Sequence, residues 1–224
     1  MGTTALPNLL RNAYWLFCLA LFACPALAQT LPRAPGTALR ALVWNVSREQ
    51  FFDQQLGFVA ALRAMDADLI ILDEMSAQRT APDVVAMLKQ VDDAPWQVAY
   101  GSSGHNQRAV FALRGDLSPL ASFKYLPYPP RFVREMQAIR LNPRQQGQMG
   151  ASLDAGIAAF GAEARHAGRR LLVVGVDLQC CGDTDDAWEE RRRHVEARII
   201  RRTLEQAWST RRPDAVIVAG DFNA

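Results

Sequence analysis

Short apolar runs alternate along this chain with segments whose apolar positions recur at helical spacing. The runs are rich in β-branched residues and bounded by turn residues, which is typical of buried strands. We predict strands at 39–46, 67–72, 96–100, 107–113, 171–176 and 216–219. We predict helices at 51–65, 82–91 and 183–208, the last capped by Asp185 or Asp186. Strand, helix and strand in succession indicate an α/β domain built in layers.

Two stretches carry a weaker pattern. Several prolines interrupt 119–143, so we predict irregular structure there and leave local order open at 132–141. The segment 147–166 is rich in Ala and Gly, and we predict a weak helix for it. The strands at 96–100 and 107–113 flank the polar loop 101–106, which predicts a hairpin.

The first 28 residues have the pattern of an export signal. Arg11 supplies the positive charge, an apolar core follows, and Ala26-Leu27-Ala28 forms a cleavage site before Gln29. A retained anchor and a lipoprotein modified at Cys24 remain alternatives. We therefore predict a signal peptide at 1–28, a leader at 29–38 and one domain at 39–224. We expect a periplasmic or secreted protein with no transmembrane span after cleavage.

Charge and cysteine content narrow the choice of partners. Loss of Arg11 with the signal lowers the net charge from +2 to +1, which argues against a strongly basic nucleic-acid-binding surface. The mature chain keeps only Cys180 and Cys181. Adjacent cysteines form two thiols or a local disulfide, and they supply too few ligands for a soft metal. Nothing in the sequence indicates a stable protein partner.

Polar residues close several of the predicted strands. They are Asn45, Glu74, Asp177, Asp221 and Asn223. Strand ends gather at one edge of an α/β sheet, where such folds keep their sites. Carboxylate and amide oxygens suit Mg²⁺ or Mn²⁺, and a cation held this way supports hydrolysis of phosphoesters.

Each of these residues also has a structural interpretation. Asn after a strand is common in turns, Glu74 suits a solvated surface, and Asp-x-Asn is a frequent turn composition. His105 and Arg108, in and after the polar loop, either bind a substrate phosphate or belong to a solvated hairpin. The arginines of 191–202 favour a solvated helix face.

The strand ends are similar to motifs of the endonuclease/exonuclease/phosphatase superfamily, also called deoxyribonuclease-I-like. Trp44-Asn45-Val46 resembles its first motif, Ile71-Leu72-Asp73-Glu74 its second, and Gly220-Asp221-Phe222-Asn223-Ala224 its late motif. The resemblance spans 39–224. It implies a four-layer α/β/β/α sandwich and metal-dependent hydrolysis of phosphoesters.

By the same resemblance, each motif residue has an expected role. Glu74 is the metal ligand, and Asn45 supports the metal ligand or the phosphate. Asp221 orients or activates the attacking water, and Asn223 contacts the scissile phosphate. Asp177 stands where the family often has a catalytic histidine.

Three features depart from the family pattern. Asp73 replaces the Gln that usually precedes the metal-binding Glu. Asp177 cannot act as a cationic imidazolium acid, so a proton for the leaving group must come from elsewhere. The closing Ser-Asp-His motif does not occur before Ala224. We therefore expect that the C-terminal strands are missing, that 216–219 is an edge strand and that activity is low.

The function predicted from these observations is an exported, Mg²⁺- or Mn²⁺-dependent hydrolase of phosphodiesters or phosphomonoesters, nuclease-like or phospholipase-like. The family's substrates include nucleic acids, phospholipid head groups and inositol phosphates. The alternative is a binding protein that keeps the fold without the chemistry. Asp73, Asp177 and the missing motif favour that alternative.

Overall fold

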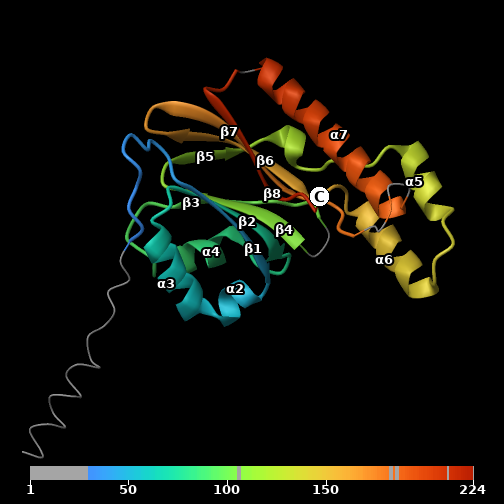
Figure 1. Ribbon diagram of the computed structural model, residues 1–224, viewed down its shortest axis with the longest axis horizontal. Coiled ribbons are helices and arrows are strands. Elements are labelled where there is room, and N and C mark those ends of the chain that lie inside the picture. Colours follow the sequence, from blue (N-terminus) through green and yellow to red (C-terminus); the bar gives the residue numbers. More distant parts are fainter. Residues whose placement is uncertain (1–29, 105–106, 182–183, 185–186, 211, 224) are drawn as a thin grey trace, which may run out of the picture.

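Two four-stranded sheets lie face to face in the computed structural model, with helices on their outer faces (Figure 1). The structure describes residues 30–104, 107–181, 184, 187–210 and 212–223. The predicted signal peptide, His105 and the predicted cap at Asp185 or Asp186 lie outside these residues. The α/β/β/α sandwich predicted from the motifs is confirmed.

The first sheet has the order β1-β2-β4-β3 and the second β5-β6-β7-β8. The strands are β1 (Ala41–Arg48), β2 (Leu69–Ser76), β3 (Gln97–Tyr100), β4 (Gln107–Leu113), β5 (Asp116–Pro119), β6 (Ala159–His166), β7 (Arg169–Asp177) and β8 (Ala215–Asp221). The helices are α2 (Gln50–Asp53), α3 (Gln55–Met65), α4 (Ala81–Leu88), the short 3₁₀ helix η1 (Ala121–Phe123), α5 (Pro130–Gln137), α6 (Pro143–Asp154) and α7 (Trp188–Thr210).

Alternate residues of the central strands pack into different layers. On β2, Leu69 and Ile71 face the layer between the sheets, whereas Ile70 and Leu72 pack with α3 and α4. On β7, Val173 lies between the sheets and Val174 packs in the layer that contains α5, α6 and α7. Burial on both faces explains why these strands are continuous apolar runs rather than alternating ones.

Parallel pairing brings the ends of four strands together. β1 pairs with β2 in parallel, and β7 pairs with β8 in parallel. The last residues of β8 lie at the end of the sheets that faces α5 and α6 (Figure 1). β8 is an edge of its sheet, as predicted, and it leaves Val218 exposed.

The helix predicted in 147–166 is wrong in its second half, which forms β6. The structure pairs this segment with β7 along its whole length. The small residues that suggested a helix are needed for packing: a Cβ on Gly161 would come within 2.5 Å of the Phe123 ring. Long-range pairing therefore overrides the weak local preference.

Other element boundaries also differ from the prediction. The helix expected at 51–65 is two helices, α2 and α3, which meet at Gln54. The strand β5 was not predicted, and α5 gives order to part of the proline-rich segment. Among the described residues, no helix combines the length and apolar character that crossing a membrane requires.

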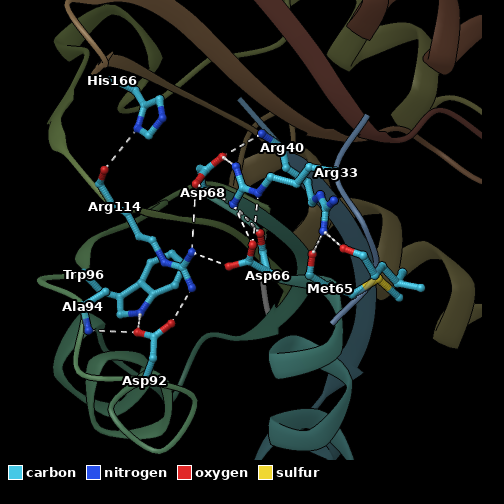
Figure 2. A network of polar contacts seen from close by, with 11 residues as sticks. Arg33, Arg40, Met65, Asp66, Asp68, Asp92, Ala94, Trp96, Arg114 and His166 are labelled. Carbon is cyan, nitrogen blue, oxygen red and sulfur yellow. Dashed lines mark hydrogen bonds and ion pairs between the residues drawn. The ribbon is translucent and has the colours of Figure 1, made fainter. Parts of the chain in front are cut away.

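Charged residues tie the segment before β1 to the start of β2 (Figure 2). Arg33 donates to Asp68 through Nη1 at 2.7 Å and through Nη2 at 3.0 Å. Arg114 pairs with Asp66 at 2.8 Å and with Asp92. The residues described from the predicted leader are thus bound to the domain by a network of alternating charges.

Candidate active site

Four carboxylates lie at the ends of three strands, opposite the network of Figure 2. Asp73 and Glu74 come from β2, Asp177 ends β7, and Asp221 ends β8, in register with Asp177. We call them the acidic cluster. In the described part of the chain, no Arg, Lys or His forms an ion pair with any of the four, and their charges repel one another.

An irregularity in β2 sets the position of Glu74. The register with β1 and with β4 shifts between Leu72 and Met75, and Glu74 has a φ of +52°. A positive φ is costly for a residue with a side chain and persists where the surroundings impose it, often at functional sites. Asn45 Nδ2 donates to Glu74 Oε1 at 2.9 Å, so two of the predicted residues meet directly.

Asp73 turns into the layer between the sheets. It is 2 % exposed, and its Oδ1 is buried with no hydrogen-bond partner among the described residues. Burial, together with repulsion from Asp221 and Glu74, raises the pKa of Asp73 to about 6. The residue that replaces the family's Gln therefore belongs to the acidic cluster.

Asp177 is also held partly protonated near neutral pH. Burial, followed by repulsion from Glu74, Asp73 and Asp221, raises its pKa to about 7. This value is close to the ordinary pKa of the histidine that the family often has at the corresponding position. The carboxyl group nevertheless becomes negative, not neutral, when it loses its proton.

The turn after β8 depends on its glycine. Gly220 has a φ of +132°, and a Cβ there would lie 2.0 Å from the carbonyl oxygen of Val176 on β7. Asp221 Oδ1 accepts the backbone N–H of Asn223 at 2.9 Å, and Asn223 Nδ2 donates to the Leu178 carbonyl at 2.8 Å. The predicted Gly-Asp-Phe-Asn motif is thus a closed turn that fixes Asp221 and Asn223 against β7.

A cleft of about 830 Å³ opens above these strand ends. Glu74, Asp177, Asp221 and Asn223 line it, so four predicted site residues meet in one cavity. Arg108 lies half-buried on β4 and is not among the lining residues. Its pKa is lowered by burial.

Sequence reasoning missed the opposite wall of the cleft. Arg144, Gln148 and Ser152 of α6 line it, with Arg192 of α7. Arg192 also corrects the prediction of a solvated arginine face, because its side chain is buried against Tyr128 and Glu196. Arg191, Arg201 and Arg202 are exposed, as predicted.

Cys180 and Cys181 sit at the edge of the cleft as free thiols. Both are exposed, and their sulfur atoms are 2.9 Å apart. The hydrogen bond with Cys181, followed by burial, raises the pKa of Cys180 to about 11. Cys180 is therefore protonated at neutral pH and is not an activated nucleophile.

The donors of the acidic cluster fit a hard cation by their chemistry. They are all oxygens, one of them buried without a partner, and a divalent cation would offset the repulsion that raises two of the pKa values. In the described ranges, no three Asp, Glu, His or Cys side chains converge as a complete metal cage. Mg²⁺ is commonly bound through one or two carboxylates, with water and phosphate as the remaining ligands.

Several solved structures have a fold similar to that of this chain. A truncated TDP2 from Caenorhabditis elegans is 10% identical, with a TM-score of 0.54, over 83% of this chain and 62% of that chain. The human Nocturnin catalytic domain is 14% identical, with a TM-score of 0.51, over 83% and 64%. ANGEL2, described as a 2′,3′-cyclic phosphatase, is 10% identical, with a TM-score of 0.53, over 85% and 57%.

These likenesses establish the fold. The chain has the deoxyribonuclease-I-like fold, as the motifs predicted. It spans about three fifths of the length of the solved chains that it matches. No protein-family model and no curated protein matches its sequence.

Proposed function

We propose that this chain, with its deoxyribonuclease-I-like fold, is a Mg²⁺- or Mn²⁺-dependent hydrolase of phosphoesters. One observation carries the proposal: four carboxylates that form no ion pair with a described residue line or underlie one cleft, and one of them sits on a strained bulge. A fold that needed these groups only for stability would gain by pairing them with cations. ANGEL2, which has a similar fold and is described as a 2′,3′-cyclic phosphatase, supports the same reaction class.

Glu74 would hold the cation, and Asn45 would orient Glu74. The hydrogen bond from Asn45 fixes one carboxylate oxygen and leaves the other free to bind. When bound, the metal ion would offset the negative charge that develops on the phosphoryl oxygens. Asp73, which lies behind Glu74, would add negative potential to the same place.

Asp221 would orient or activate the attacking water. Its Oδ1 accepts the Asn223 backbone N–H, so this carboxylate is held in a fixed direction at the cleft. Asn223, whose Nδ2 donates one hydrogen to the Leu178 carbonyl, would donate the second hydrogen of Nδ2 to the phosphate. Asp177, which is partly protonated near neutral pH, would hold a proton within the same cavity.

We also propose that the protein is exported and acts in the periplasm or outside the cell. The support is the charge, apolar core and Ala26-Leu27-Ala28 pattern of residues 1–28. Detection of a mature chain that begins at Gln29 in the periplasmic or culture fraction tests it. Full-length chain retained in the cytosol would contradict it.

Hydrolysis of bis(p-nitrophenyl) phosphate tests the reaction. We expect slow turnover with Mg²⁺ and none with EDTA, and at least a hundredfold loss in Glu74→Gln. Glu205→Gln is the matched control, because Glu205 is an exposed carboxylate on α7 away from the cleft. It should keep the wild-type rate.

Two outcomes would count against the enzyme. Equal rates in wild type and Glu74→Gln would remove the metal role of Glu74. Calorimetric binding of Mg²⁺ that Glu74→Gln abolishes, without any turnover, would favour the binding-protein alternative.

A further inference from the structure

The cleft has two poles of opposite charge. Glu74, Asp177 and Asp221 form the acidic pole on the strand ends. Across the cavity, Arg144 lies in the first turn of α6, and Arg192 comes from α7. We call Arg144, Gln148, Ser152 and Arg192 the basic wall. The proposed hydrolysis uses the acidic pole only, so the basic wall has no role in it so far.

Arg192 is a buried cation whose donors are only partly used. The residue Arg192 is 7 % exposed. Nε donates to Glu196 Oε1 at 2.9 Å and to the Tyr128 hydroxyl at 3.0 Å, and Nη2 donates to Ser152 Oγ at 2.7 Å. No described residue accepts a hydrogen bond from Nη1. A guanidinium fixed on one side presents its other side to whatever enters the cavity.

The fixed side of Arg192 also makes the wall rigid. Glu196 accepts the Gln179 backbone N–H at 2.8 Å, so the same ion pair holds the loop after β7. Ser152 joins α6 to the network. Helix α6 is capped at its N-terminus by Asn142, and its first turn, with the positive end of the helix dipole, borders the cavity.

Part of the basic wall also lines a second cavity. This cavity of about 320 Å³ shares Gln148, Ser152, Gln179 and Arg192 with the cleft. A ligand that reaches the basic wall from the acidic pole therefore has room on both sides of it. The volume of the cleft is in the range of sites for small molecules.

From this geometry we infer that the basic wall binds a second anionic group of the substrate, a phosphate separate from the one that is hydrolysed. The inference rests on the proposed function for the identity of the first phosphate. Arginine suits this task because its planar fork pairs with two phosphate oxygens. The second phosphate belongs either to a small bisphosphorylated molecule or to the next nucleotide of a strand, and the chemistry at the wall is the same.

Two chromogenic substrates that differ only in the second phosphate test the inference. They are thymidine 5′-(p-nitrophenyl phosphate) and its 3′-phosphorylated derivative. We expect the wild type to have a KM roughly tenfold lower for the 3′-phosphorylated substrate, with similar kcat, as one charge-assisted contact provides. Arg144→Gln should remove most of this difference in KM, and Arg192→Lys should reduce it.

Arg202→Gln is the control for the change in net charge. Arg202 is exposed on α7 and lines neither cavity, so the KM difference should remain. Arg144 is at the start of α6 and is not part of the buried network, so its variant should fold normally. Equal KM values for the two substrates in wild type, or an unchanged difference in Arg144→Gln, would overturn the inference.

A binding experiment separates this inference from the proposed hydrolysis. In EDTA the acidic pole repels anions, so pyrophosphate should bind at the arginines of the cleft, and the Arg144→Gln variant shows whether the basic wall is the site. Binding that Arg144→Gln weakens about tenfold would support the wall even if no substrate were hydrolysed. No binding in wild type would overturn it. Competition by inositol bisphosphate or by short oligothymidylate then identifies the source of the second phosphate.

Discussion

Strand β2 has carboxylates near both ends, and the two pairs of carboxylates differ in whether arginine binds them. Before the strand, Asp66 and Asp68 are bound by Arg33 and Arg114 (Figure 2). Near its other end, Asp73 and Glu74 form no ion pair with any residue in the described part of the chain. The first end binds the N-terminal segment to the domain, and the second end opens into the cleft.

Burial does not explain this difference. Asp68 is 6 % exposed and Asp73 is 2 % exposed. Burial acts to raise the pKa of Asp68, but hydrogen bonds from Arg33 and from the Arg40 backbone hold the pKa below its usual value. Burial and repulsion raise the pKa of Asp73 to about 6. The presence of a counter-cation, and not depth, therefore separates the structural carboxylates from the proposed functional ones.

Removal of the charge of Asp68 tests whether the carboxylates paired with arginine before β2 stabilise the fold. Asp68→Asn leaves Arg33 and Arg114 with less compensation, because Arg33 donates to both Asp68 oxygens. We expect a loss of about 4 kcal/mol in the free energy of unfolding, measured by urea titration. Asp116→Asn on the exposed strand β5 is the control and should change it little. A loss that matches the control would show that the network does not stabilise the fold.

The pH dependence of stability tests the acidic cluster. The folded pKa values of Asp73 and Asp177, about 6 and about 7, lie above the unfolded value of 3.8. The unfolded chain therefore loses these protons first, and stability falls as pH rises from about 5 to about 7. In EDTA we expect a decrease of about 3 kcal/mol over this window. The lowered pKa values of Asp66 and Asp68 affect stability below about pH 5, outside the window.

The double variant Asp73→Asn with Asp177→Asn is the control for this window. It should remove most of the pH dependence between pH 5 and pH 7. A wild type whose stability rises with pH in EDTA would contradict the unpaired state of the cluster.

Asp73→Asn gives the direct counterpart of Asp68→Asn. Replacement of a buried carboxylate that forms no ion pair with a described residue should stabilise the protein, by about 3 kcal/mol at pH 8, because the fold raises its pKa from 3.8 to about 6. Replacement of Asp by Asn should thus lower the free energy of unfolding at Asp68 and raise it at Asp73. The measurement is urea unfolding at pH 8 and at pH 4, and the gain should vanish at pH 4. A gain that persists at pH 4 would point to packing instead of charge.

The strands that are buried on both faces could be predicted from the sequence. Ile70 and Ile71, for example, pack in different layers, so β2 is a continuous apolar run that local sequence identifies as a strand. β6 was missed because its Ala and Gly residues are explained only by Phe123 and by pairing with β7. Glu74, Asp177 and Asp221 were predicted because they end apolar strands. Arg192 was missed because its partner Tyr128 is distant in the sequence, so periodicity cannot single it out among its neighbouring arginines.

Stabilisation by Mg²⁺ is the smallest of the expected effects, and it tests specifically the carboxylates of the acidic cluster. At a concentration about ten times its Kd, Mg²⁺ should raise the free energy of unfolding by about 1.4 kcal/mol, because only the folded chain assembles the acidic cluster. Glu74→Gln should lose this increase, since its carboxylate is the proposed ligand and the hydrogen bond from Asn45 orients it. Asp68→Asn, although less stable, should keep the full increase, since its own end of β2 is already neutralised by arginine. If Mg²⁺ stabilised wild type and Glu74→Gln equally, the cation would bind elsewhere, and the unpaired carboxylates would need another explanation.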